Sequence, residues 1–544
     1  MKINLIDLLL LLILSGIVIN RNYIQNYSVF SLHYYELFGL VIIYVALRNT
    51  SDNEYYLLAL AVICNALIQV ILTSLQLSNY TTSNNKYFAF TGCFLNPGVL
   101  AGFFVSTLAP LFVGYMGVIR EKLSSYFTIT YLLDNIILII CVLVFGVTIL
   151  TSSRAACSAI VVFLLLLYFP MIKYKVSKIT NIYKGLLFLT FSLIAILTVI
   201  YVYLLKKDSA NGRWLIWCST FDMIKDVPFT GVGYDGFKSF YMNYQAMTLR
   251  EDYAQRYKSI AGETIYAFND LLQLFAENGV FIGASVIILV ILLVKTKIED
   301  NNKLAELSKY NLVSIAVFSL FSYPSTILLI KINVLFYIAI LAKYHKNIII
   351  FRVSLGSIYA RTIQLGVWGI GLFFIVVFWK KNSNLINDFH TWNEAREAYN
   401  NSDYVGAIEF FREIYPTFSK DGDFLMQYGK ALELNGEHLE ALKYLEPAAL
   451  FHNTYFLQCA IGDAKKGINH IAEAESCYML ASSMIPARFY ADYLLAHLYY
   501  ETGQKKKARS ISEELLSKRI KIQSMAIDDI LKKISEISKK TINE

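Results

Sequence analysis

The sequence predicts an all-α protein: a polytopic bundle of membrane-spanning helices followed by an α-solenoid of helical repeats. Three observations predict this class. The 544 residues are 56% hydrophobic and 17% charged, and the mean hydropathy is +0.48, which is too apolar for a soluble multidomain protein. Long apolar runs recur up to about residue 380. Beyond that point the composition becomes polar and helix-forming, with an internal period.

About eleven apolar runs are long enough to cross roughly 30 Å of hydrocarbon. They cover residues 5–20, 29–47, 54–76, 98–119, 126–150, 155–172, 184–205, 270–294, 311–329, 331–343 and 359–379. The first run could be a signal peptide, but no small-residue cleavage site follows it, so we interpret it as a span. The tenth run is short. We expect it to share a broken hairpin with the ninth around Tyr323 and Pro324, where neighbouring protein can satisfy the backbone.

The basic residues of the short loops predict the orientation of this bundle. With a cytoplasmic N-terminus, one set of loops carries most of the Lys and Arg. The opposite set carries only Arg21, Lys86, Arg154 and Lys331. This bias places three segments together on the outer side: the loop around 77–97, the long loop of about 206–269 and everything after Lys380.

The composition also excludes several kinds of site. The seven cysteines are scattered and include no C-x-x-C pair, so neither a disulfide framework nor a zinc site is indicated. The net charge of +8 comes largely from the loops, as membrane topology requires, so we expect no nucleic-acid partner. We expect no metal and no cofactor.

A repeat follows the membrane domain, which we assign to residues 1–380. Ala407, Ala441, Ala474 and Ala508 recur at 34, 33 and 34 residues, and Gly429 and Gly462 at 33. This pattern resembles a tetratricopeptide array, in which small residues allow paired helices to pack closely. We predict a helical domain at 391–540, with about four units over 391–519 and then a capping helix. The expected role is a concave surface that binds a protein partner; the alternative is a scaffold that braces the membrane domain.

Polar residues are costly within a membrane domain, so polar clusters there mark candidate sites. The first cluster is 151–156, where Arg154 interrupts apolar sequence among small residues that let a ligand approach. The alternative is a flanking charge at the start of a helix. We favour a substrate-binding role, because flanking charges are commoner on the inner side.

The second cluster lies in the long loop. Arg213 and Trp217 are one helical turn apart, so the guanidinium and the indole share a face. A bidentate Arg suits phosphate, and an aromatic face suits a sugar or a lipid interface. The alternative is an amphipathic helix at the membrane surface with a snorkelling Arg and an anchoring Trp. The stretch 228–233 then predicts a tight turn, and Lys238 beyond it is a further candidate for substrate binding.

The third cluster precedes and begins a predicted span. Glu263 and Asp270 are candidate general bases, Asn269 could orient an acceptor, and Gln273 is a candidate for substrate binding. For Asp270 the alternative is a carboxylate stabilised by the dipole at a helix N-terminus. That alternative leaves Glu263 and Gln273 without a role.

Taken in order, these motifs resemble the O-antigen ligase and O-antigen polymerase (Wzy-C type) superfamily. The motifs are Gly92 to Pro97, Ser153 to Ala155, Gly212 and Arg213 with Trp217, Pro228 with Gly231 and Gly233, and Asn269 to Gln273 with Glu277 and Gly279. The resemblance covers roughly residues 88–345. It extends to the subgroup in which a tetratricopeptide array follows the membrane domain.

The resemblance implies a metal-independent glycosyltransferase of the bacterial inner membrane. Its donor would be a glycan linked to polyprenyl diphosphate, and its acceptor lipid A core, a growing glycan or a protein. The long periplasmic loop would cover the site, and Arg154 and Arg213 would hold the diphosphate. Guanidinium groups placed in advance stabilise a leaving diphosphate electrostatically.

One position departs from the family pattern. Many ligases carry a His immediately before the Asn of the third motif, and Phe268 stands there in this chain. The seven His residues all lie elsewhere. Either Glu263 or Asp270 then takes the role of the base, or the acceptor needs little help, or the protein is not an active ligase.

Two other functions stay open. A transporter or flippase of lipid-linked glycans predicts charged residues in mid-span and internal symmetry. Asp134 and Glu36 are intramembrane acids, but the membrane half shows no evident repeat. A noncatalytic membrane anchor for the repeat domain would need one span rather than many. Membrane lipid is an expected partner in every case.

Overall fold

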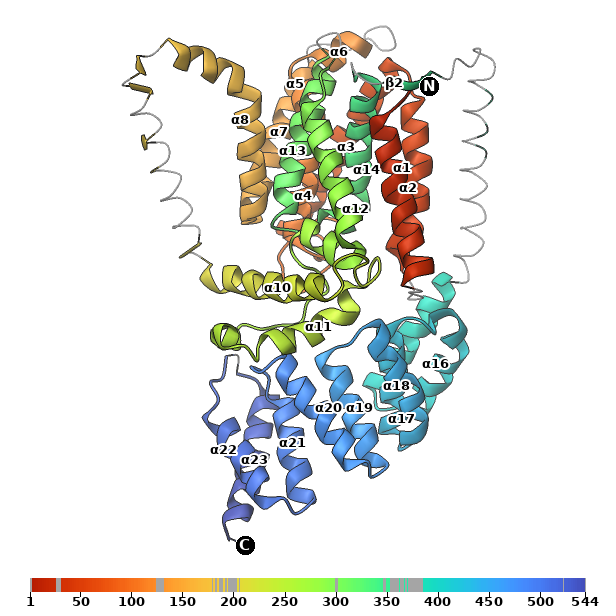
Figure 1. Ribbon diagram of the computed structural model, residues 1–544, viewed down its shortest axis with the longest axis vertical. Helices are drawn as coiled ribbons and strands as arrows, with labels where there is room; N and C mark the ends of the chain where they lie inside the picture. The colour runs from red at the N-terminus through yellow and green to blue at the C-terminus, as the bar shows by residue number, and fades with distance from the viewer. Residues whose placement is uncertain are drawn as a thin grey trace.

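The computed structural model describes residues 2–25, 31–123, 132–178, 206–298, 302–345, 349–352, 385–521 and 523–543, with scattered residues between 180 and 204 and between 362 and 369. In these ranges the chain is mainly helical and forms three layers (Figure 1). A bundle of long helices lies at one end. Two helices lie across its base, and an array of shorter helices forms the other end.

The bundle consists mainly of long apolar helices. They are α1 (Leu5–Ile19), α2 (Leu32–Arg48), α3 (Asp52–Leu77), α4 (Pro97–Ser106), α5 (Leu108–Tyr115), α7 (Leu132–Leu150), α8 (Arg154–Ser177), α12 (Asp270–Lys295), α13 (Lys303–Ser319) and α14 (Leu328–Lys343). Short helices at their ends are η1 (Asn20–Ile24), α6 (Val118–Leu123) and η3 (Pro324–Thr326). Strands β1 (Lys2–Asn4) and β2 (Ile349–Arg352) pair antiparallel, an addition to the predicted all-α fold.

The number of spans stays a prediction. By length and composition, five helices in the described ranges could each cross a membrane, or six if the bent pair α4 and α5 counts as one span. Helices α2, α13 and α14 have only 17, 17 and 16 residues. The runs predicted at 184–205 and 359–379 fall largely outside the described residues. The protein is therefore a multi-pass membrane protein.

One predicted span is bent in the structure. The run 98–119 divides into α4 and α5, which meet at 47° around Thr107. The bend frees the carbonyl of Ser106, which accepts hydrogen bonds from Asn311 Nδ2 at 3.0 Å and from the hydroxyl of Tyr337. Neighbouring helices thus supply the partners that the bend removes, as a backbone buried in a bundle requires.

The ninth and tenth predicted runs have different boundaries in the structure. Helix α13 begins earlier than predicted, because Asn302 caps it by accepting a hydrogen bond from the backbone N–H of Ala305. It ends at Ser319, and α14 begins at Leu328. The segment between them contains Tyr323 and the short helix η3, which begins at Pro324, and this is where the broken hairpin is predicted.

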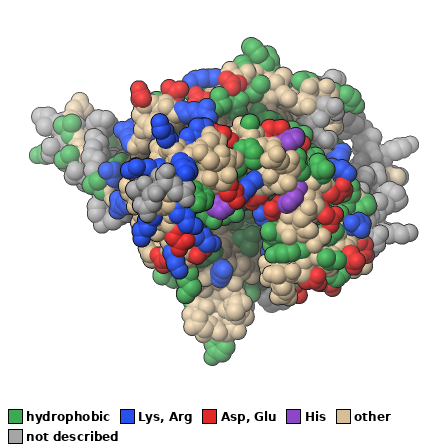
Figure 2. Space-filling view, turned by 90° about the horizontal axis from the view of Figure 1, so that it is seen from below, with side chains coloured by type: hydrophobic (Ala, Val, Ile, Leu, Met, Phe, Trp, Pro, Cys, Tyr) green, Lys and Arg blue, Asp and Glu red, His purple; other side chains and the backbone are tan. Residues whose placement is uncertain are grey.

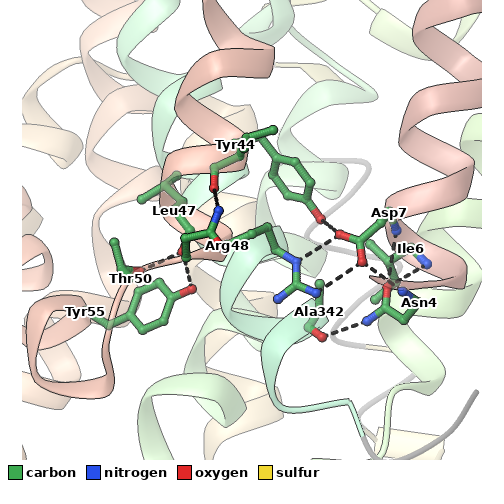
Figure 3. A network of polar contacts seen from close by, with 11 residues as sticks. Asn4, Ile6, Asp7, Tyr44, Leu47, Arg48, Thr50, Tyr55 and Ala342 are labelled. Atoms are coloured by element: carbon green, nitrogen blue, oxygen red, sulfur yellow. Dashed lines mark hydrogen bonds and ion pairs between the residues drawn. The ribbon is translucent and has the colours of Figure 1, made fainter. Parts of the chain in front are cut away.

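A buried ion pair ties the bundle together at the end that carries the N-terminus (Figure 3). Arg48 donates to both carboxylate oxygens of Asp7, from Nε at 2.9 Å and from Nη2 at 3.1 Å. The hydroxyl of Tyr44 donates to the same carboxylate at 2.7 Å, and Asn4 Nδ2 donates to the carbonyl of Ala342 at 2.7 Å. These contacts join α1, α2 and α14 and satisfy a charge pair that would otherwise be costly.

The long loop is mostly helical. It contains α10 (Lys207–Asp226), α11 (Phe237–Thr248) and η2 (Asp252–Tyr257), and α10 and α11 form the crosswise layer of Figure 1. Arg213 and Trp217 lie on α10, as their spacing predicts. Residues 258–269 then lead into α12 without a helix or a strand.

The C-terminal domain consists of packed consecutive helices. After a helix at 385–400 come α16 (Tyr404–Phe418), α17 (Gly422–Leu434), α18 (His438–Phe451), α19 (Tyr455–Gly467), α20 (Ile471–Met484), α21 (Tyr490–Glu501), α22 (Lys505–Ser517) and α23 (Met525–Asn543). Lys, Arg, Asp and Glu are spread over the surface seen from this end (Figure 2), as expected for helices that face water.

The period seen in the sequence is also a period of the backbone. Ser402, Gly436, Asn469 and Gly503 have φ of 63°, 84°, 62° and 72°, so a left-handed residue recurs at every second turn between the helices of the array. The recurring alanines are fully buried. A Cβ on Gly429 or Gly462 would lie 2.5 Å from Leu445 or 2.4 Å from Tyr478, so these glycines permit close helix packing.

Candidate functional site

The predicted site residues on α8, α10 and α12 gather at the end of the bundle that faces α10. The start of α8 contacts α10, because Arg154 Nη2 donates to Ser209 Oγ at 3.5 Å. Segment 91–97 contacts the break between α13 and α14, because Asn96 Nδ2 donates to the hydroxyl of Tyr323 at 3.3 Å. Five segments that are far apart in sequence thus meet here: 91–97, the start of α8, α10, 263–270 and 321–326.

Arg213 is the most distinctive charge in this region. It is half-buried, and among the residues that the structure describes its guanidinium makes neither a hydrogen bond nor an ion pair. Burial lowers its pKa, and the nearby positive charge of Arg154 lowers it further. Two guanidinium groups held close together favour an anion between them, because the anion relieves their repulsion.

An aromatic wall lies beside Arg213. Its guanidinium carbon is 5.4 Å from the ring centroid of Phe268, and this ring packs edge-on against Tyr323 at 5.3 Å. Tyr323 stacks on Tyr266 with centroids 4.3 Å apart. The wall offers flat apolar faces with phenol groups at their edge.

Phe268 adopts an unusual backbone conformation. Its φ is +52°, in the left-handed region that non-glycine residues seldom occupy. The surrounding contacts hold it there: Trp217 Nε1 donates to the carbonyl of Ala267 at 3.1 Å, and the N–H of Ala267 donates to Gln273 Oε1 at 3.1 Å. Trp217 and Gln273, both predicted to bind substrate, therefore anchor the segment that carries Phe268.

Asp270 lies at the start of α12, two residues after Phe268. Its carboxylate accepts hydrogen bonds from Ser325 Oγ at 2.7 Å and from the backbone N–H of Ser325 at 3.0 Å. The carboxylate thus points toward the break that also holds Tyr323. Asn269 is the N-cap of α12, because its side-chain oxygen accepts from the N–H of Leu272 at 3.1 Å.

Glu277, which appears in the third motif, holds the glycine turn of the long loop. Its carboxylate accepts from the backbone N–H of Asp235 at 3.0 Å and from Gln273 Nε2 at 3.1 Å. The N–H of Gly233 donates to the carbonyl of Glu277 at 2.8 Å. Gly279 has φ +76° and ψ 179°, a conformation that only glycine adopts readily. The glycine turn follows α10, and these contacts attach it to α12.

Two predicted site residues face the C-terminal domain. Glu263 lies 3.8 Å from Arg488, which follows α20. Lys238 lies near Asp421 and Asp423: burial and Asp423 raise the pKa of Asp421, while Lys238 lowers it. No contact in the described residues joins Glu263 or Lys238 to Arg154 or Arg213.

Four residues of this region are not among the site residues that the sequence predicts: Asn96, Tyr266, Tyr323 and Ser325. Asn96 belongs to the first motif, and Tyr323 to Ser325 are polar residues in the break of an apolar hairpin. This polar break in an apolar segment is the sequence feature from which Tyr323 and Ser325 could be predicted as site residues. Within the described ranges, no group of three or more His, Cys, Asp or Glu side chains could hold a metal ion.

Comparison with known proteins bears on this region. The sequence model of the O-antigen ligase family matches residues 139–288. This stretch includes Arg154, Arg213 and Asp270, and with them most of the cluster described above. A TPR repeat-containing protein of Methanocaldococcus jannaschii, MJ1428, is 25% identical over 134 residues, which are 24% of this chain and 24% of that protein.

The match spans about a quarter of that relative's length, and its printed name supports the subgroup with tetratricopeptide repeats. Over residues 139–288 this multi-pass membrane protein is therefore similar to the O-antigen ligase family.

Proposed function

We propose that the protein transfers a glycan from polyprenyl diphosphate to an acceptor at the end of the bundle that faces α10. The observation that carries this proposal is the proximity of Arg213 to Arg154, with no carboxylate bonded to Arg213 in the described residues. A half-buried guanidinium without an internal anion is costly unless a ligand supplies one. A diphosphate has the charge and the oxygen geometry that two arginines bind well.

In the proposed reaction, the bond between the anomeric carbon of the glycan and the diphosphate oxygen breaks. A new bond forms between that carbon and an acceptor oxygen or nitrogen. The bonding electrons leave with polyprenyl diphosphate, where Arg154 and Arg213 stabilise the added charge. The acceptor proton passes to a carboxylate, and the stacked rings of Tyr266 and Tyr323 offer a surface for a sugar.

Asp270 is the better candidate for that carboxylate. It is bonded to Ser325 beside Tyr323, at the aromatic wall. Glu263 instead pairs with Arg488, and the oxygen of Asn269 caps a helix. Phe268 has no group that can accept a proton. We therefore assign the base role to Asp270 and a structural role to Asn269, Trp217 and Gln273.

The cellular setting follows from the charge bias of the loops. Helices α10 and α11 and the C-terminal domain lie at one end of the bundle. Arg48, Arg120 and Lys343 lie at the other end. By the positive-inside rule, the site and the repeats would face the periplasm of a bacterium, with the bundle in the inner membrane. We propose domains at 1–380 and 391–540, the latter an array of tetratricopeptide units. The acceptor would be lipid A core, a growing glycan or a protein.

The test is complementation of a deletion strain. Wild type, Arg213→Ala and Arg250→Ala are expressed, and lipopolysaccharide, polymer length and glycoprotein are compared on one gel. Arg250 is the matched control, since it follows α11 and is exposed. We expect Arg213→Ala to abolish one product class, which names the acceptor, while Arg250→Ala keeps it. If every product persists in the deletion strain itself, the transferase proposal fails, and transport of lipid-linked glycan or membrane anchoring replaces it.

A further inference from the structure

The C-terminal array and the long loop share one buried core. From the membrane domain it includes Met223, Phe237, Tyr241, Met242, Ala246, Ala267 and Ala276, and from the array Tyr455, Cys459, Ala481, Met484, Ile485 and Ala491. Tyr241 and Tyr455 are fully buried in it. An apolar interface of this kind resembles a domain core rather than a transient contact.

Helix α11 binds the array in register with its repeat. Ser239 Oγ donates to the carbonyl of Phe451 at 2.5 Å, and Gln245 Nε2 donates to the carbonyl of Met484 at 2.7 Å. Phe451 ends α18 and Met484 ends α20, so the two carbonyls are one repeat apart. Carbonyls at a helix C-terminus lack partners within the helix, and α11 supplies them here.

Further polar contacts surround these two. Asn453 Nδ2 donates to Asn243 Oδ1 at 2.8 Å, and Lys521 Nζ donates to the carbonyl of Ser259 at 3.4 Å. The contacts with the array therefore reach from α11 to segment 258–269, which has no helix or strand of its own.

Arg488 extends these contacts toward the transfer site. Its guanidinium lies 4.9 Å from the ring centroid of Tyr455 and 4.7 Å from that of Phe456, so two aromatic rings fix its position. Its Nη1 is buried without a hydrogen bond and lies 3.8 Å from Glu263 Oε2. Glu263 is five residues before Phe268, in the segment that Trp217 and Gln273 anchor at Ala267.

We propose that the array stays docked on the long loop and braces the transfer site. Arg488 is then a positioning residue that acts through Glu263. The pair anchors one end of segment 263–269, and the bonds to Ala267 anchor its middle. Together they hold Phe268 in its left-handed conformation beside Arg213 and bring Asp270 to Ser325. The array then supports the site through the face that α11 covers. This is the bracing role, which is the alternative to binding a protein partner. The effect on turnover rests on the proposed glycan transfer, whereas the docking does not.

Cross-linking in isolated membranes tests the docking. The pair Asn243→Cys/Asn453→Cys is treated with a short bifunctional thiol reagent, and the linked peptides are measured by mass spectrometry. Each single variant and the wild type, which has seven cysteines of its own, receive the same reagent. We expect linkage well above that of the single variants. A yield no higher than theirs overturns the docking whether or not the protein transfers glycan.

The activity of the cross-linked protein then tests whether the array stays docked on the long loop during turnover. We expect the cross-linked protein to keep at least about half of the turnover of reagent-treated wild type, because nothing needs to move apart. A loss of about tenfold or more would show that the array must leave the loop during turnover, and it would overturn the proposal.

A double-mutant cycle tests the positioning role. Glu263→Gln and Arg488→Gln are each expected to lower kcat per folded molecule about tenfold, with the donor KM little changed, because small displacements of reacting groups are costly. The double variant should be no slower than the slower single variant. Additive losses, or losses in folded yield alone, contradict positioning. Arg509→Gln, whose arginine pairs with Glu513 at 2.7 Å on α22, should match wild type.

Discussion

At the scale of single residues, the proposed site depends on which charges lack an internal partner. Arg48 is balanced by Asp7, and Arg120 by Asp134 at 2.9 Å. Among the described residues, Arg213 lies against the face of Phe268 and is repelled by Arg154, and no carboxylate is bonded to it. Because Arg48 and Arg120 are each paired with a carboxylate, an external anion is the natural partner for Arg213.

The two candidate bases should differ in their effect on transfer. Asp270→Asn removes the proton acceptor that lies at the aromatic wall, so we expect at least a hundredfold loss of turnover. Glu263→Gln removes only an anchor, and the expected loss is about tenfold. Initial rates with purified protein, normalised to folded material, separate these outcomes. A larger loss for Glu263→Gln than for Asp270→Asn would exchange the two roles.

The sequence predicts that Arg154, Arg213 and Asp270 lie on one side of the membrane, because each lies at or beside the end of an apolar run. It could not see that Glu263 faces Arg488, because the two residues are 225 positions apart and no periodicity relates them. Trp217 and Gln273 were expected to touch substrate, whereas their side chains bind the backbone of Ala267.

At the scale of elements, the glycine turn is what fastens the long loop to α12. A Cβ on Gly279 would lie 2.0 Å from the carbonyl oxygen of Phe229, and its φ of +76° excludes other residues. We expect Gly279→Ala to destabilise the protein by about 2–4 kcal/mol through strain and displaced backbone. Thermal unfolding in detergent, followed by size-exclusion chromatography, measures the loss.

Gly146→Ala is the matched control for this glycine. Gly146 lies within α7, and nothing lies within 4 Å of the position that a Cβ would take. Alanine there should be neutral or slightly stabilising, because it favours helix. Equal melting temperatures for the two alanine variants would contradict the role given to the turn.

The contact between the start of α17 and the end of α18 should make the array sensitive to acid. Burial acts to raise the pKa of Asp423, but a hydrogen bond from His452 at 2.9 Å and the charges of His452 and Lys238 outweigh it, so the pKa is lowered. A lowered carboxylate pKa adds stability above its unfolded value of about 4, and this is lost as pH falls through the folded value.

We therefore expect acidification from pH 6 to about pH 3 to cost wild type about 1–3 °C of melting temperature more than Asp423→Asn, a modest effect for a partly exposed pair. Helical circular dichroism of the full chain at the two pH values makes the comparison. Asp421, whose pKa is raised by burial and acts in the opposite direction, is present in both proteins. An identical pH dependence would show that the pair contributes nothing.

The sequence predicts the positions of some helices and turns but not of others. The positions of the repeats are a prediction that rests on Ala407, Ala441 and their equivalents, which must be small wherever helices touch. The bend at Thr107 was not predicted, because it depends on hydrogen bonds to the carbonyl of Ser106 from Asn311 and Tyr337, on distant helices. Apolar composition alone cannot show where such partners will lie.

At the scale of the whole molecule, the position of the site and the repeats predicts how the protein is oriented in the membrane. The site and the repeats lie at one end of the bundle, and the loops with most basic residues are predicted at the other. A reporter that is active only outside the cytoplasm, fused after Lys381, should be active. The same reporter fused after Lys122 should be silent. Activity at Lys122 alone would reverse the orientation and place the repeats in the cytoplasm, without altering Arg154 or Arg213.

The most direct test of the central claim uses the purified full chain in lipid vesicles with a polyprenyl-diphosphate-linked glycan. Release of polyprenyl diphosphate in the presence of acceptor is measured for wild type, Arg213→Ala and the exposed control Arg250→Ala. We predict acceptor-dependent release by wild type and the control, and at least a hundredfold slower release by Arg213→Ala. Equal release by wild type and Arg213→Ala would contradict it.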